Sequence, residues 1–540
     1  MVWTNAGITH RSTVMGRRGM VASAHPLASL AGLRALMAGG NAIDAAVATS
    51  AALNVVEPYM SGLGGGGAML VHTGSGETVS LNYGGPVPAA ARAETLDPAS
   101  VDVGPKAGVI PGIPAGWFAA LGRFGSMPAG DLFAPAIEYA EAGVALTVKN
   151  SAFFASGADR VHGDARAIFF PAGSTPSAGT IIRQPRLAAT YRALAEGGAD
   201  AFYRGPVGER FVAAIRAAGG LITAEDLAAT TVTWGEPSVS RYRGLELRTT
   251  GWPLTSYETQ LSLNILEGFD LAAMGHNGAG TIHTMVEAFK LAMADRIEYA
   301  GRVEPPPAGL LSREYAAHRR TLIDPGRAQP IEGDRYTRPR PDGAVMPGDP
   351  ADVTRECTTH LDVVDAQGNA VSITQSIGSI FGSGFMAGDT GIMLNNFLYF
   401  YDVDPASPNA VRPGMPWGGP LAPTMLLRDG RLFLSIGTPG GFGITQTTAQ
   451  MISNVADHGY GVQAAIEAPR FKVVKDRQLV IEERVPAEVR AELSRRGHEL
   501  QVVEPWSASV GGGQGILIDP ETGALSGGAD PRRDGYALGW

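Results

Sequence analysis

The spacing of hydrophobic and polar residues changes close to residue 358. Before this point, apolar positions recur at helical spacing over much of residues 110–300, and residues 42–56 are apolar almost all round. A helix without a polar face is typical of a large buried core. After it, apolar and polar residues alternate, which is the pattern of strands joined in hairpins. The predicted turns lie near residues 367–369, 429–430 and 521–523. We therefore expect an α+β protein in which helices pack on antiparallel sheets.

Two segments interrupt this pattern. The glycine run at residues 62–67 fits GxGxxG, but it follows a helical pattern and leads into a strand-like one. A dinucleotide-binding loop instead follows a strand and opens a helix. We interpret the run as a loop that lets a helix and a strand pack closely, which disfavours a nucleotide-dependent oxidoreductase. Residues 302–356 are rich in Pro, Arg and Asp and predict an exposed linker.

Composition excludes several classes of protein. The net charge is −9 with no long Lys/Arg block, so nucleic-acid binding is not expected. The single cysteine, Cys357, excludes an intramolecular disulfide, and the ten scattered histidines indicate neither a metal site nor a cofactor. No apolar run has the length of a membrane span, and the N-terminus lacks the pattern of a signal peptide. We expect a cytoplasmic protein that does not contact membranes.

Thr358 is the candidate nucleophile. A hydroxyl needs a base to take its proton, and no GxSxG elbow occurs in the chain. An α-amine has a pKa of about 7.7–8.0, against ~10.4 for lysine, so it can serve as that base at neutral pH. This requires a cut directly before the threonine, and Thr358 lies where the predicted linker meets a predicted strand. Spacing alone leaves a plainer interpretation open, in which Thr358 and Thr359 are two β-forming residues that begin a strand.

Longer segments carry a family resemblance. They are TTHLDVVDAQGNAVSITQS, PTMLLRDGRLFLSIGTPGGFGITQTTAQ, the opening GMVASAHPLASLAGLRALMAGGNAIDAAVATSAALNVVEPYMSGLGGGGAML and the ending GGADPRRDG. Together they resemble the gamma-glutamyltransferase family over nearly the whole chain. The resemblance implies an N-terminal nucleophile hydrolase with an αββα sandwich, in which two antiparallel sheets lie between helical layers. It also implies a precursor that cuts itself before a threonine.

The resemblance assigns roles to particular residues. The cut falls between Cys357 and Thr358, giving a large chain of residues 1–357 and a small chain of residues 358–540 that associate into one catalytic body. Thr358 attacks an acyl carbonyl, and its freed amine is the base. Ser376 stands where the family usually has a threonine that bonds this amine. Gly440 and Gly441 match the glycine pair whose N–H groups form the oxyanion hole. A dimer of processed pairs is left open.

The predicted substrate pocket departs from the family pattern. A glycine replaces an arginine of the family, and glycine, proline and phenylalanine replace polar residues that hold a glutamyl head. The candidate substrate-binding residues are Gly84, Thr374, Gly378, Phe397, Phe400, Arg412, Gly419 and Pro420. Losing one partner of a buried charge pair costs about 2–5 kcal/mol, so we expect a substrate other than glutathione. Arg412 is a candidate partner for a substrate carboxylate, and an ordinary buried strand remains the alternative for the aromatic residues 397–401.

The leading hypothesis is a threonine-dependent amidohydrolase or acyltransferase that acts on a small amide. The resembling family also contains cephalosporin acylases, an oxamate amidohydrolase and enzymes that break a carbon–carbon bond in alkylproline antibiotic pathways. These activities, a genuine gamma-glutamyltransferase and a non-catalytic binding paralogue remain alternatives.

Overall fold

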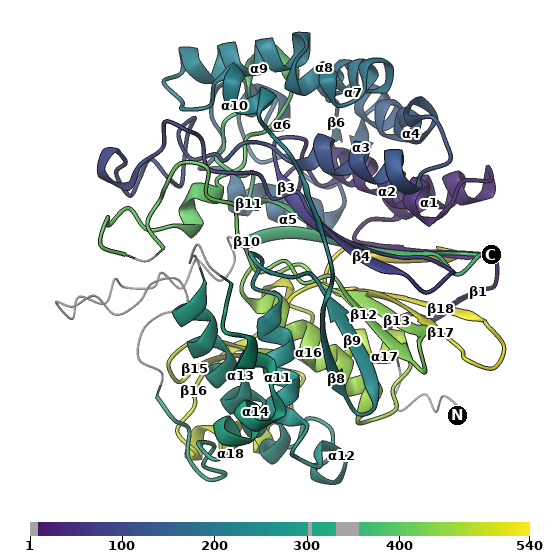
Figure 1. Cartoon of the computed structure of the whole chain (residues 1–540), viewed down its shortest axis with the longest axis vertical. Helices are drawn as coiled ribbons and strands as arrows, with labels where there is room; N and C mark the ends of the chain where they lie inside the picture. The colour runs from purple at the N-terminus through teal and green to yellow at the C-terminus, as the bar shows by residue number, and fades with distance from the viewer. Residues whose placement is uncertain (1–8, 301–304, 331–355, 408) are drawn as a thin grey trace.

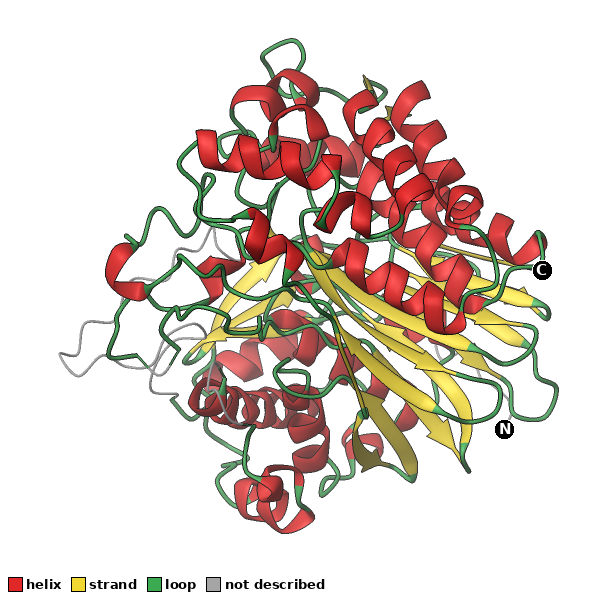
Figure 2. Ribbon diagram, turned by 45° about the horizontal axis from the view of Figure 1, so that its top comes forward, coloured by secondary structure: helices red, strands yellow, loops and turns green. Residues whose placement is uncertain are grey.

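The chain forms four layers, with two β-sheets face to face between two layers of helices (Figures 1 and 2). The structure is a computed structural model and describes residues 9–300, 305–330, 356–407 and 409–540. The sequence-based prediction of an α+β sandwich with the architecture of an N-terminal nucleophile hydrolase is confirmed. In the described part of the chain, no helix is both long and apolar enough to cross a membrane.

Each of the two large sheets has seven strands, and every pairing within them is antiparallel. The first sheet has the order β19 (Tyr536–Gly539), β2 (Gly19–Ser23), β10 (Glu356–Asp365), β11 (Ala370–Ser379), β3 (Gly66–His72), β4 (Thr78–Asn82), β7 (Thr233–Gly235). The second sheet has the order β1 (Val14–Gly16), β18 (Leu525–Ala529), β17 (Gln514–Ile518), β13 (Arg431–Gly437), β12 (Thr424–Arg428), β9 (Leu245–Thr249), β8 (Ser238–Tyr242). Both sheets combine strands from before and after residue 358.

The three predicted hairpins are confirmed as β10–β11, β12–β13 and β17–β18. The second turns at Asp429 and Gly430, whose φ angles are 50° and 76°. Positive φ at both central residues is the type I′ geometry that follows the natural twist of two paired strands. The sequence Asp-Gly therefore fixes this turn locally.

Helices cover the outer face of each sheet (Figure 1). Over the first sheet lie α1 (Pro26–Met37), α2 (Ala42–Val56), α3 (Ile113–Phe124), α4 (Ala129–Ala142), α5 (Val148–Gly157), α6 (Gly163–Phe169), α7 (Pro185–Gly197), α8 (Asp200–Tyr203), α9 (Pro206–Ala217) and α10 (Ala224–Ala228). Over the second lie α11 (Tyr257–Leu266), α12 (Leu271–Met274), α13 (Ala279–Tyr299), α14 (Arg313–Arg320), α16 (Gly443–Ala456), α17 (Val462–Glu467) and α18 (Ala487–Arg495). Two smaller sheets consist of β5 (Val144–Ala145) with β6 (Ile181–Ile182), and of β14 (Phe471–Lys475), β15 (Gln478–Glu482) and β16 (Glu499–Val503).

Helix α2 is buried at every one of its residues, as its sequence predicts. Asn41 caps its first turn by accepting hydrogen bonds from the N–H groups of Ile43 and Asp44. The helix packs between the first sheet and its neighbouring helices in one apolar cluster. A separate cluster, which includes Met20, Leu70, Met425 and Ile516, fills the space between the two sheets. The sheet that carries residue 358 is thus packed on both faces.

Two sequence interpretations have clear outcomes. The glycine run does form a tight loop between α2 and β3, because a Cβ on Gly64 or Gly65 would lie only 2.1 Å from a backbone oxygen. The described part of the predicted linker, residues 305–330, is mostly exposed as expected, but it is not without regular structure. Residues Ala308–Leu311 form a 3-10 helix and α14 follows, packed on α11, with Ala316 buried in the apolar cluster that α11 and α13 share. Residues 331–355 lie outside the described residues.

Candidate active site

Thr358 lies in β10 at an irregularity of the β10–β11 pairing. Cys357 is opposite Gly378, whereas Thr359 is opposite Gln375, so two residues of β11 face the single residue Thr358. Such a β-bulge changes the direction of side chains and is common beside active sites. Thr358 is buried, with 3% of its surface exposed. The predicted nucleophile is therefore held on a rigid, centrally placed strand.

Ser376 connects the Thr358 hydroxyl to the peptide bond before it. Thr358 Oγ1 lies 3.5 Å from Ser376 Oγ, and Ser376 Oγ donates to the carbonyl oxygen of Cys357 at 2.5 Å. The N–H of Gly378 donates to the same serine oxygen at 2.8 Å. One buried hydroxyl therefore contacts both the nucleophile and the carbonyl of the bond predicted to be cut.

The predicted oxyanion-hole glycines form a turn between β13 and α16. Gly440 and Gly441 are buried and have φ angles of 133° and 54°, a region that favours glycine. Neither of their N–H groups donates to an acceptor among the described residues. The turn also precedes the N-terminus of α16, where the helix dipole favours negative charge. This arrangement can stabilise an oxyanion.

Arg533 and Glu57 lie beside the nucleophile, and the sequence analysis missed both. Arg533 Nη1 donates to the Thr358 carbonyl oxygen at 3.0 Å, and Thr359 Oγ1 donates to Glu57 Oε2 at 2.9 Å. Burial raises the pKa of Glu57 to about 7, while the charge of Arg533 and the hydrogen bond from Thr359 oppose the rise. Arg533 stands in the ending motif GGADPRRDG, which could have drawn attention to it.

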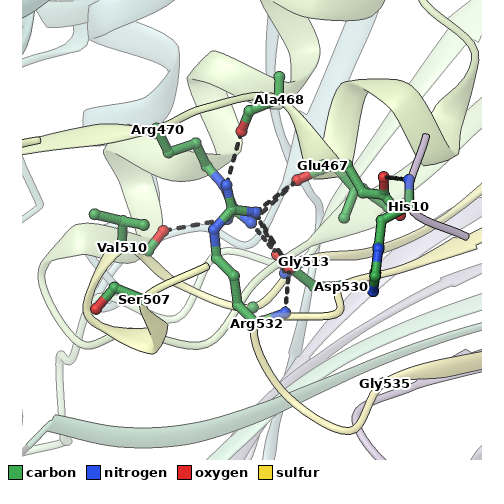
Figure 3. A network of polar contacts seen from close by, with 12 residues as sticks. His10, Glu467, Ala468, Arg470, Ser507, Val510, Gly513, Asp530, Arg532 and Gly535 are labelled. Atoms are coloured by element: carbon green, nitrogen blue, oxygen red, sulfur yellow. Dashed lines mark hydrogen bonds and ion pairs between the residues drawn. The ribbon is translucent and has the colours of Figure 1, made fainter. Parts of the chain in front are cut away.

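A buried ionic network fixes the segment that carries Arg533 (Figure 3). The carboxylate of Asp530 pairs with both Arg470 and Arg532, and Arg532 also donates to Glu482 at 2.9 and 2.7 Å. All four of these side chains are fully buried. Removing one member of such a network leaves an uncompensated buried charge, which is strongly destabilising. The network therefore positions the backbone directly before Arg533.

Trp417 occupies the space beside two glycines that were predicted to contact substrate. A Cβ on Gly84 would lie 2.8 Å from Cε3 of Trp417, and one on Gly419 would lie 2.0 Å from its Cζ2. The indole is buried and stacks on Phe397, with ring centres 4.0 Å apart and planes 8° from parallel. Larger side chains at Gly84 and Gly419 are thus excluded by an aromatic ring that the sequence analysis did not identify.

Trp417 also lines a cavity. Its walls include Trp417, Gly419, Phe400 and Phe442, and Phe442 directly follows the glycine turn at residues 440–441. Arg296 also lines it, stacked over the Phe442 ring at 4.2 Å. The guanidinium of Arg296 pairs with the buried carboxylate of Glu258 at 3.0 Å. The cavity therefore combines an aromatic wall with a paired buried charge, next to the candidate oxyanion hole.

Comparison with known proteins agrees with this geometry. The gamma-glutamyltranspeptidase family model matches residues 28–540. The chain is 36% identical to the Acylase ACY 1 proenzyme of Pseudomonas sp. (strain SE83), over 96% of this chain and 93% of that protein. It is 34% identical to the glutathione hydrolase proenzyme of Escherichia coli (strain K12), over 96% and 91%. The crystal structure of cephalosporin acylase from Bacillus halodurans superposes with a TM-score of 0.89 at 33% identity, covering 99% of this chain and 98% of that one.

The chain belongs to the gamma-glutamyltranspeptidase family. The predicted family and its N-terminal nucleophile hydrolase fold are therefore confirmed, and the protein is an enzyme of this hydrolase family. The names of its relatives include both acylases and glutathione hydrolases, so membership alone leaves the substrate open.

Within this gamma-glutamyltranspeptidase fold, some predicted substrate-binding residues lie apart from the cavity. Thr374 is buried in β11 and bonds His360 Nδ1 at 2.8 Å, while Arg412 lies on the surface. Pro420 is buried and does not line the cavity. Gly378 has a φ of 99° and packs against Asn396, so a larger side chain does not fit. None of these four lines the cavity, and neither do Thr358, Ser376, Gly440 and Gly441, although Phe442, which follows the glycine pair, does.

The aromatic residues 397–401 do not form a strand. Phe397–Phe400 is a 3-10 helix in which Phe397 is buried against Trp417 and Phe400 reaches the cavity. Tyr401 also lines the cavity. The alternative of an ordinary buried strand is therefore wrong. Asn396, directly before this 3-10 helix, accepts a hydrogen bond from the Ser379 N–H at the end of β11.

A cluster between α13 and the turn after α18 has side chains of the kind that bind metals. His283, Glu287 and His498 are buried, with potential donor atoms within 4.8 Å of one another. His283 Nδ1 and His498 Nε2 bond each other at 2.8 Å, and Lys290 pairs with Glu287 at 2.9 Å. Burial lowers the pKa of His498 to about 3. The two histidines thus join α13, which also holds the Glu287–Lys290 pair, to the turn between α18 and β16, and His498 Nδ1 has no hydrogen-bond partner among the described residues.

Proposed function

We propose that this protein is an autoprocessing amidohydrolase or acyltransferase with Thr358 as its nucleophile, acting on a small amide whose acyl group is not glutamyl. The observation that carries the proposal is the position of Ser376. Its hydroxyl lies between the Thr358 hydroxyl and the Cys357 carbonyl, at the bond that must break. A hydroxyl that merely filled a strand would not need both contacts.

Processing begins with attack of Thr358 Oγ1 on the carbonyl carbon of Cys357. The C–N bond breaks, the acyl group moves to the oxygen as an ester, and the hydroxyl proton passes to the released nitrogen. Water then hydrolyses the ester, leaving a carboxylate on Cys357 and a free amine on Thr358. The hydrogen bond from Ser376 stabilises the negative charge on the attacked oxygen. Residues 1–357 and 358–540 stay together because both contribute strands to each sheet.

In turnover, the new α-amine accepts the proton of the Thr358 hydroxyl as this oxygen attacks the amide carbonyl of the substrate. The N–H groups of Gly440 and Gly441 stabilise the oxyanion, and each such donor contributes about 2.7–4 kcal/mol. The amine of the substrate leaves with the proton. Water or a second amine then takes the acyl group from Thr358.

The packing of Trp417 supports a non-glutamyl substrate. A glutamyl head carries a carboxylate and an ammonium, and each needs a partner once water is excluded. The indole of Trp417 fills the space beside Gly84 and Gly419. Larger polar side chains at these two positions would need that space. Losing two pairings at ~2 kcal/mol each comes to about 4 kcal/mol, or nearly a thousandfold in catalytic efficiency. The aromatic cavity wall favours an acyl group with an apolar body.

Mass spectrometry of the intact purified protein tests the processing step. We expect two chains, the second beginning at Thr358, and a single uncut chain in the Thr358→Ala variant. An uncut wild-type protein would favour the non-catalytic alternative, and cleavage of the variant at the same bond would assign the cut to another protease. Kinetics on matched glutamyl and apolar-acyl anilides test the substrate. A clear preference for the glutamyl compound would support the glutathione hydrolase alternative.

A further inference from the structure

Two buried groups of opposite charge contact residues 358 and 359 of β10. Arg533 bonds the carbonyl oxygen of Thr358 at 3.0 Å, and covalent geometry places its guanidinium within ~7 Å of the Thr358 nitrogen. Glu57 accepts a hydrogen bond from the hydroxyl of Thr359, the next residue in β10, at 2.9 Å, and it also feels the charge of Arg533. Arg533 and Glu57 are 3% and 1% exposed. Bulk water therefore screens neither charge effectively.

Other titratable groups also face Arg533 and Glu57. Burial raises the pKa of Tyr59 well above its usual range, so this neighbour of Glu57 stays neutral. Asp534 also interacts with Glu57, and it is itself held by Thr147 with Lys149 nearby. On β10 itself, His360 pairs with Asp362 at 2.9 Å. The described surroundings thus include one cation that bonds Thr358 directly and one anion that bonds its neighbour.

We propose that Arg533 and Glu57 act as opposed charges on the α-amine of processed Thr358, with Arg533 favouring its neutral, proton-accepting form and Glu57 its ammonium form. The inference rests on the proposed function, because the α-amine exists only after the cut. Both are positioning residues, since they act through Thr358 and not on the substrate. The pair would adjust how much of the base is available at neutral pH.

The sign of each effect follows from Coulomb's law. A positive charge disfavours a second positive charge, so the guanidinium lowers the pKa of the amine, and a carboxylate raises it. At ~6 Å and an effective dielectric constant of ~20, one charge shifts the pKa by about two units, and we expect about half of this after relaxation. Burial raises the pKa of Glu57 to about 7. Its anion therefore forms in the same pH range in which the amine loses its proton.

The experiment compares pH profiles of kcat/KM for the processed full-length enzyme and three variants. The substrate is the apolar-acyl anilide that the wild-type enzyme cleaves best. Arg533→Met removes the cation, Arg533→Lys keeps it, and Glu57→Gln removes the anion while still accepting the bond from Thr359. We expect the midpoint of the acidic limb to rise by about one pH unit in Arg533→Met, to move by less than half a unit in Arg533→Lys, and to fall in Glu57→Gln.

Arg204→Met is the matched control, because Arg204 pairs with Asp200 on the exposed surface and its removal should leave the midpoint unchanged. Midpoints that do not move, or that move in the same direction in Arg533→Met and Glu57→Gln, would overturn the inference even if kcat falls. If the Arg533→Met variant fails to process, the pH profile of Glu57→Gln tests the inference alone. An unchanged or raised midpoint of its acidic limb would then overturn the inference. A wild-type protein that stays uncut contradicts the proposed function instead, so mass spectrometry separates the two failures.

Discussion

Replacing Ser376 with alanine tests the precursor chemistry most directly. In the uncut chain its hydroxyl donates to the Cys357 carbonyl oxygen at 2.5 Å, which is the atom that becomes negatively charged when Thr358 attacks. The interaction therefore strengthens as the reaction proceeds, which is the condition for a catalytic effect. Losing one such donor costs about 2.7–4 kcal/mol, so self-cleavage should slow by roughly 10²–10³-fold.

The same substitution has a separate, smaller effect on stability. The N–H of Gly378 donates to Ser376 Oγ at 2.8 Å, and alanine leaves this buried group without its acceptor. The expected cost is about 1–3 kcal/mol, which a protein with an extensive core tolerates. Thermal denaturation of the variant should therefore show a folded protein with a lower Tm, and slow cleavage cannot be assigned to unfolding.

The assay follows the ratio of precursor to cut chains by intact mass at fixed temperature after purification. Ser376→Thr is the matched control, because it keeps the hydroxyl and adds one methyl group at a position that is 3% exposed. It should process at a rate much closer to that of the wild type. An alanine variant that is folded and cut as fast as the wild type would refute the role assigned to Ser376.

Three further predictions use other parts of the structure. Cys357→Ser should process and turn over nearly normally, because the thiol leaves with the large chain; loss of turnover in a processed variant would assign the chemistry to sulfur. Gly84→Arg should lower the Tm, because its Cβ would lie 2.8 Å from Trp417. Adding Trp417→Gly to this variant should restore some stability and raise its activity on a glutamyl anilide. An unchanged Tm in the single Gly84→Arg variant would contradict this prediction. Burial lowers the pKa of His25 to about 4 in the folded protein. Between pH 6.5 and pH 4 the unfolded chain therefore binds more protons than the folded one. The free energy of unfolding should fall by about 3 kcal/mol as the pH is lowered over that range. Urea denaturation of wild type and His25→Asn, which keeps a side-chain acceptor at the helix cap, measures this difference, and equal pH dependence in both would argue against it.

Local patterns were sufficient to predict much of the fold. The alternation around residues 359–376 predicted the β10–β11 hairpin, and the apolar composition of residues 42–56 predicted a fully buried helix. These predictions succeed because hairpin turns and buried faces depend on residues that are close in the sequence. The prediction of a linker over residues 302–356 was wrong at α14. In its charged sequence REYAAHRR only one residue, an alanine, is buried. A helix with so narrow an apolar face has little sequence signal.

The sequence by itself determined the family, the fold class and the candidates Thr358, Ser376, Gly440 and Gly441, because these lie in continuous motifs. Only the tertiary structure decided what surrounds them. Trp417, Glu57 and Arg533 come from segments far from Thr358 along the chain, and no local pattern links a tryptophan to Gly84 or an arginine near the C-terminus to residue 358. Contacts of this kind arise when the two sheets combine strands from both ends of the chain, so the charges and the shape around the nucleophile are properties of the packed core.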